Sequence, residues 1–160
     1  MSCGQQDKIN DQKIEAQIRS YIDNVYFKNN FTAEIIELKI NDVQEVKLDS
    51  VVQQILKNEF LRIAALIVDP FNNPEDFDFM SLTTEAMDQA LETSEYKSIK
   101  DRLTKNVENS PNNIALSIKI YVKITATNLN TDKKKNYLWE NIYFLLDERF
   151  SMINDPIVFK

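Results

Sequence analysis

The chain has 160 residues, 43% of them hydrophobic, and a formal net charge of −6, values typical of a globular chain of single-domain size. It contains no histidine, one cysteine and one glycine. This composition excludes histidine-dependent catalysis, histidine-ligated metals, intrachain disulfides and glycine-rich phosphate loops. We therefore expect no cofactor and no metal, and the acidic balance disfavours nucleic acid as a partner.

The first residues contain one short motif, Ser2-Cys3-Gly4. It resembles the cleavage junction of bacterial lipoproteins, those of Bacteroidota in particular. In that family the cysteine becomes the first mature residue, carries the lipid and precedes a polar tether. The resemblance implies lipid attachment at Cys3 and a flexible tether over residues 1–11, although the upstream lipobox leucine and the apolar signal segment are missing. The alternative is an unmodified thiol in a frayed terminus.

Residues 9–28 predict a helix, because apolar side chains recur on one stripe. The stripe consists of Ile14, Ile18, Tyr21, Ile22 and Val25. Asn29-Asn30 should end this helix, since asparagine tolerates the left-handed conformation. Residues 32–48 predict a strand in which Ile36, Leu38 and Ile40 share the buried face, with a change of phase at residues 41–43.

Asp49-Ser50 offers an N-cap for a helix over 51–68, which Pro70 ends. Residues 69–82 read as a loop, and we expect its three phenylalanines to pin it to the domain. These are Phe71, Phe77 and Phe79. Thr83 or Thr84 caps the next helix, which restarts at Thr93-Ser94 and continues to about residue 108.

Strict alternation over 114–126 predicts a long strand with one core face. A polar hairpin loop over 128–134 leads to a return strand over 135–150 that is apolar on both faces. The predicted order is α-β-α-α-β-β: an α+β fold with helices packed on one face of an antiparallel sheet and a long C-terminal hairpin. We expect one domain over residues 12–160.

This pattern resembles NTF2-like and cystatin-like lipoproteins of bacteria. The segments Val122–Asn128 and Phe144–Asp147 also resemble the final hairpin of small uncharacterised bacterial envelope proteins. Neither resemblance implies catalytic residues.

The first candidate site is acidic. No lysine or arginine occurs from Asp69 to Glu95. Oxygen ligands for Ca²⁺ would come from the loop carboxylates, but their spacing is not that of an EF-hand and the required glycine is missing. A solvated acidic face is the plain alternative. We favour a surface for a basic protein partner, formed by Asp69, Glu75, Asp76 and Asp78.

The second candidate is aromatic. Four side chains are expected to line one face of the final hairpin, where they would bind a partner or pack beneath a helix as core. They are Tyr121, Tyr137, Trp139 and Tyr143. Paired carboxylates, Glu34 with Glu37 or Asp147 with Glu148, would be needed for an enzyme. Asp147 and Glu148 would point to opposite faces of a regular strand and could not act together.

These observations predict a non-enzymatic binding or accessory module, tethered to the bacterial cell envelope through a lipid on Cys3. No run of 18 apolar residues is present to span a bilayer. The alternative is a cytoplasmic immunity or adaptor protein that uses the same acidic surface, and a carboxylate-based enzyme is the third hypothesis. The identity of the partner and the oligomeric state stay open.

Overall fold

The computed structural model describes residues 3–27, 29–71 and 73–158. The chain forms two compact units. The sheet unit comprises Met1–Val46 and Ile114–Lys160, and the helical unit comprises Lys47–Asn113. The single domain expected over residues 12–160 stays a prediction, because a compact unit need not fold independently.

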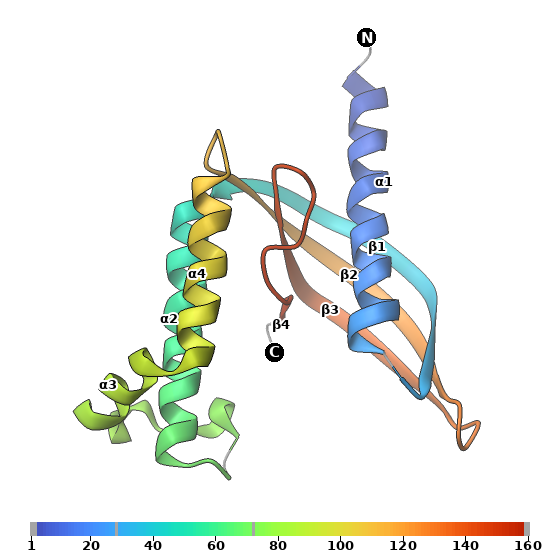
Figure 1. Ribbon diagram of the computed structural model, residues 1–160. Coiled ribbons are helices and arrows are strands. Elements are labelled where there is room, and N and C mark those ends of the chain that lie inside the picture. Colours follow the sequence, from blue (N-terminus) through green and yellow to red (C-terminus); the bar gives the residue numbers. More distant parts are fainter. Residues whose placement is uncertain (1–2, 28, 72, 159–160) are drawn as a thin grey trace. The chain divides into compact units, whose positions relative to one another are not determined.

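In the sheet unit, the described residues form one long helix, a π-helical turn and four strands in the order β1-β2-β3-β4 (Figure 1). Strand β3 is antiparallel to both of its neighbours. The elements are α1 (Cys3–Tyr21), η1 (Ile22–Tyr26), β1 (Phe31–Lys47), β2 (Ile114–Asn128), β3 (Lys134–Asp147) and β4 (Ile157–Val158). The predicted α+β class is confirmed, and α1 covers most of the segment expected to be a tether.

Helix α1 packs on the sheet through the predicted stripe, since Ile14, Ile18 and Ile22 are buried against β2 and β3. The stripe does not continue to Val25, which is 48% exposed. The reason is the π-helical turn, closed by the Phe27 N–H donating to the Ile22 carbonyl (3.0 Å). Its additional residue rotates the chain, so that Phe27 becomes the buried side chain. Asn29, with φ 69°, then ends the element as predicted.

The β2–β3 hairpin contains a bulge that changes which side chains share a face. Ile120 lies opposite Ile142, but Val122 lies opposite Trp139, so two steps along β2 match three along β3. The additional residue of β3 reverses its alternation toward the hairpin tip. Strand β1 changes phase too. Ile35 and Leu38 both pack on the core, and Ile36 between them is 58% exposed, so the phase changes earlier than at residues 41–43.

The part of the helical unit that the structure describes forms three helices and two short 3₁₀ turns. Its elements are α2 (Leu48–Val68), η2 (Pro74–Asp76), η3 (Phe79–Ser81), α3 (Thr84–Glu92) and α4 (Ser94–Glu108). Thr83 caps α3 through Oγ1, which accepts from the Ala86 N–H (3.1 Å), and Thr93 caps α4 in the same way from Tyr96 (3.2 Å). The first cap is thus Thr83 rather than the alternative Thr84, and the restart predicted at Thr93-Ser94 is confirmed. The apolar faces of α2 and α3 meet at Ala64 and Ala90.

The two ends of the helical unit are joined by hydrogen bonds. The Leu48 N–H donates to the Asn113 carbonyl (3.0 Å), and the Asp49 N–H donates to the Asn113 side-chain Oδ1 (2.9 Å). Helix α2 therefore begins before the predicted cap at Asp49-Ser50, because a residue distant in the sequence satisfies its first N–H groups. The packing of α2, α3 and α4 on one face of the sheet stays a prediction.

Candidate functional site

The four aromatic residues expected on one face of the hairpin lie on two faces. Tyr137 and Trp139 lie opposite the buried Ile124 and Val122, on the face that packs against α1. Tyr143 lies opposite Lys119, on the other face, which Tyr121 also shares by alternation. The bulge in β3 is the physical reason for this correction, because it moves the residues before Ile142 to the opposite side.

Tyr137 and Trp139 belong to an aromatic cluster at the end of α1. The ring centroids of Phe27 and Tyr137 are 5.1 Å apart, and those of Tyr26 and Trp139 are 4.7 Å apart. Both pairs are close to edge-to-face, the geometry that aromatic rings favour in protein cores. These two side chains therefore stabilise the contact between β3 and the end of η1.

The face of the sheet that bears Tyr121 carries a charged cluster. The ammonium groups of Lys39 and Lys123 lie 5.5 and 5.7 Å from the centroid of the Tyr121 ring. Both also pair with Glu37, at 2.7 and 3.4 Å. The hydrogen bond from Lys39 holds the pKa of the Glu37 carboxyl below its ordinary value, and contact with Tyr121 and Glu37 raises the pKa of Lys123. Two ammonium groups on one carboxylate leave this cluster with excess positive charge.

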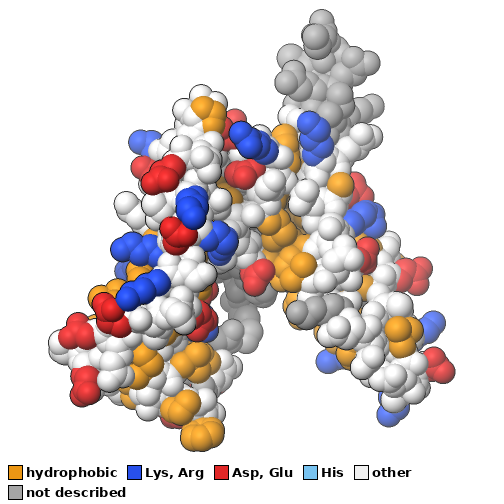
Figure 2. Space-filling model, in the orientation of Figure 1, with side chains coloured by type: hydrophobic (Ala, Val, Ile, Leu, Met, Phe, Trp, Pro, Cys, Tyr) orange, Lys and Arg blue, Asp and Glu red, His pale blue; other side chains and the backbone are white. Residues whose placement is uncertain are grey.

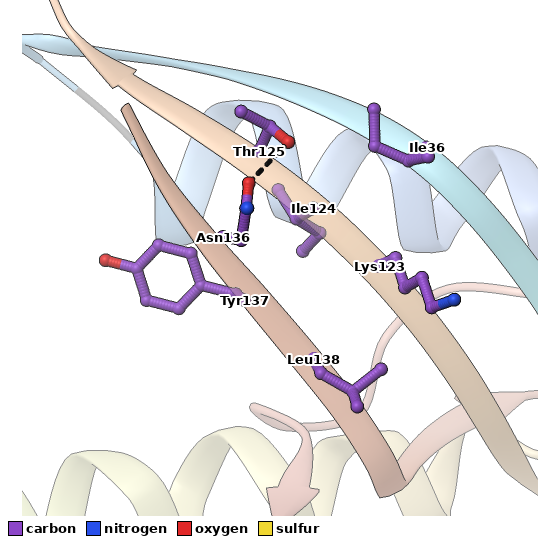
Figure 3. A pocket seen from close by; sticks show the side chains of 7 residues that line it. All are labelled: Ile36, Lys123, Ile124, Thr125, Asn136, Tyr137 and Leu138. Atoms are coloured by element: carbon purple, nitrogen blue, oxygen red, sulfur yellow. Dashed lines mark hydrogen bonds between the residues drawn. The ribbon is translucent and has the colours of Figure 1, made fainter. Parts of the chain in front are cut away.

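A shallow cavity of about 390 Å³ lies beside this cluster (Figure 3). Residues of β1, β2 and β3 line it: Ile36, Lys123, Ile124, Thr125, Asn136, Tyr137 and Leu138. Across its floor the Thr125 hydroxyl donates to Asn136 Oδ1 (2.9 Å), drawn as the dashed line in Figure 3. Ile36 and Leu138 are 58% and 51% exposed, so apolar surface borders the polar pair.

The predicted acidic residues lie in the segment between α2 and α3. Asp69 Oδ1 accepts from the Phe71 N–H (3.2 Å), and Asp78 Oδ1 accepts from the Met80 N–H (3.0 Å), so both carboxylates fix turns of the backbone. Asp76 is exposed at the end of η2, and the side chain of Glu75 lies outside the described residues. Among the described residues, no group of three potential ligands could hold a metal ion.

The phenylalanines of this segment do not pin it as predicted. Phe71 is 98% exposed, and Phe79 is largely exposed beside the half-buried Phe77, with ring centroids 5.8 Å apart. The neighbouring Met80 is 93% exposed. Figure 2 shows hydrophobic side chains at the end of the helical unit where this segment lies in Figure 1. We call residues 69–82 the acidic loop.

The paired carboxylates considered for catalysis have structural partners. Asp147 Oδ1 accepts from the backbone N–H groups of Arg149 and Ser151, both at 2.9 Å, and so holds the turn that follows β3. Glu37 is paired with two lysines, as described above. These contacts assign Asp147 to the turn and Glu37 to the charged cluster.

The cavity was not predicted from the sequence, although the alternation of β2 indicates one of the faces that border it. Lys119, Tyr121 and Lys123 occupy every second position of β2, and this alternation places the three side chains on one face of the sheet. The contributions of Ile36 and Leu138 could not be found this way, because both depend on changes of phase in β1 and β3.

Comparisons with known proteins identify no relative, since no protein-family model, no curated protein and no solved structure matches this chain. The lipoprotein, NTF2-like and cystatin-like resemblances therefore stay predictions. The side chain of Cys3 lies outside the described residues. None of the described helices combines the length and the hydrophobicity needed to cross a membrane.

Proposed function

We propose that this protein is a non-enzymatic binding module of the bacterial envelope, tethered through a lipid on Cys3, that recognises a basic protein partner with its acidic loop. The single observation that carries the binding role is the near-complete exposure of Phe71 and Met80, at 98% and 93%. Exposed apolar patches mark interaction surfaces more often than isolated exposed residues do, and Figure 2 shows hydrophobic side chains gathered at this end of the helical unit.

The backbone of the loop holds these side chains in place. The Asp69 and Asp78 carboxylates accept hydrogen bonds from the N–H groups of Phe71 and Met80 themselves. Each protruding side chain is thus attached to a turn that its acidic neighbour fixes. Binding of a partner to these side chains therefore loses less conformational entropy than binding to a flexible segment would.

The charge around the loop selects the partner. Glu92 and Glu95 are paired with Lys97 and Arg62, so they contribute little to the net field. Among the described residues, no lysine or arginine forms an ion pair with Asp76, Asp78 or Asp88. A partner segment that combines lysine or arginine with an apolar pocket complements this surface.

The test is cross-linked capture from the native cell with three forms of the full-length protein. Wild type should capture a protein that Phe71→Ser/Met80→Ser loses, and the capture should weaken at high salt. Leu129→Ser, at an exposed leucine of the β2–β3 hairpin loop, is the matched control and should retain it. Equal capture by wild type and the double variant would refute this role of the acidic loop.

The envelope tether has a separate test. The intact mass of the protein isolated from its native cell should show an acyl modification that Cys3→Ser abolishes. An unmodified Cys3 in the native protein would favour the cytoplasmic adaptor over the lipoprotein.

A further inference from the structure

We propose that the cavity between Ile36 and Leu138 binds a small amphiphilic carboxylate, with its apolar chain on these two side chains and its anionic group at Lys123 and Asn136. All lining residues belong to the sheet unit, whereas the acidic loop belongs to the helical unit. Ligand binding in the cavity and partner binding by the acidic loop can therefore be tested independently.

The apolar half of the site comes from the two phase changes in the sheet. Ile36 and Leu138 would point into the core if β1 and β3 alternated regularly, yet both are more than half exposed. They border the same cavity of about 390 Å³ from strands on either side of β2 (Figure 3). A cavity of this volume is within the range of small-molecule sites and accommodates a short aliphatic chain.

The polar half presents donors. Asn136 Oδ1 accepts from the Thr125 hydroxyl, which orients the amide so that its Nδ2 group remains available to donate to a ligand. Lys123 lies two residues before Thr125 on β2 and lines the same cavity. Its ammonium lies 3.4 Å from the Glu37 carboxylate. In the structure the Lys123 ammonium points toward Glu37 and away from Asn136, so it would rotate toward the cavity to meet an anionic group that also accepts from Asn136 (Figure 3).

The charge of this face selects an anion over a cation. By alternation, the side chains of Lys119, Lys123 and Glu34 point to this side of the sheet. The side chains of Lys39 and Glu37 lie on the same side, because Lys39 contacts Tyr121 and Glu37 contacts Lys123. Among the residues that line the cavity, Lys123 is the one with a charge, so the cavity itself presents an ammonium group. An alkylammonium ligand would be repelled, and a carboxylate would be attracted.

The experiment uses the full-length protein and three eight-carbon probes: octanoate, octan-1-ol and octylammonium. We expect octanoate to bind, with amide chemical-shift changes concentrated at residues 36, 123–125 and 136–138. Octan-1-ol should bind about fivefold more weakly, since an exposed ionic contact contributes a factor of this size. Octylammonium should not bind. Raising the salt concentration should reduce the affinity for octanoate but not for octan-1-ol.

Two variants and two matched controls complete the design. Lys123→Gln should weaken octanoate about fivefold and leave octan-1-ol unchanged, and Leu138→Asn should weaken both probes. Lys133→Gln and Leu129→Asn change exposed residues of the hairpin loop and should bind like wild type. Absence of octanoate binding up to its solubility limit, shifts located elsewhere, or equal binding of octanoate by wild type and Lys123→Gln would each overturn the proposal.

Discussion

Replacement of Phe27 by alanine tests the aromatic cluster that joins the end of η1 to the sheet. The Phe27 ring is 6% exposed and contacts the rings of Tyr26, Tyr137 and Trp139, with centroids 4.8, 5.1 and 6.4 Å away. Removing a buried phenylalanine side chain costs about 3–5 kcal/mol in unfolding free energy, because the transfer energy is lost and a cavity remains. Each of the three ring contacts contributes roughly 0.5–1.5 kcal/mol beyond area burial.

We therefore expect Phe27→Ala to lower the unfolding free energy by about 4 kcal/mol, a large fraction of the ~5–15 kcal/mol typical of a folded domain. Trp139 is the only tryptophan of the chain, so its fluorescence during urea denaturation reports on the cluster itself. Emission of the folded variant should shift to longer wavelength, since the indole loses a stacked neighbour and gains access to water.

The matched control is Phe71→Ala, which makes the same chemical change at a side chain that is 98% exposed. It should change the unfolding free energy by less than about 0.5 kcal/mol and leave the emission of Trp139 unchanged. If Phe27→Ala cost less than about 1 kcal/mol, or if the two variants behaved alike, the assignment of Phe27 to the core would be wrong.

Three further predictions concern single features of the fold. Thr93→Ala should cost about 1 kcal/mol in thermal or urea unfolding, because α4 loses its cap, whereas Thr104→Ala in the exposed middle of α4 should be nearly neutral. Burial raises the pKa of Tyr21 from 10.0 to about 12, so the folded state holds the phenol proton more tightly than the unfolded state. The unfolding free energy should therefore fall as the pH rises from 10 toward 12. Tyr21→Phe should reduce that fall and remove the phenolate absorbance that appears near pH 12. Deletion of Asn141, an exposed residue at the bulge of β3, should remove the bulge and leave Trp139 opposite Val122 on the core face, so the emission of Trp139 should match that of wild type; a shifted emission would contradict the bulge.

Most elements of the fold could be predicted from the sequence, because they depend on local signals. A few neighbouring residues are enough to indicate the alternation of β2, the helix starts near Thr83 and Thr93, and the end of α2 before Pro70. The beginning of α2 does not, because Asn113 satisfies its first N–H groups from the other end of the unit.

The candidate site was predicted less well. The bulge in β3 and the π-helical turn after α1 each insert one residue, and this residue changes which side chains face the core. Leu138 and Trp139 are both apolar, so the sequence of β3 is compatible with either one facing the core, and only the pairing with β2 decides. Val25 and Phe27 present the same ambiguity at the end of α1, where the π-helical turn decides. In the acidic loop, hydrophobicity alone predicted burial for Phe71, because sequence carries no measure of how far a loop protrudes.

The hydrogen bonds of Asn113 to Leu48 and Asp49 have a consequence for the order in which the chain folds. Strands β1 and β2 are neighbours in the sheet but are separated by the whole of Lys47–Asn113, so pairing them directly from the unfolded chain closes a long loop at a large entropic cost. If the helices assemble first, their joined ends bring the two strands together and replace that loop by a short one. Formation of the sheet should then be slow whenever the helical segment is destabilised, even by changes far from any strand.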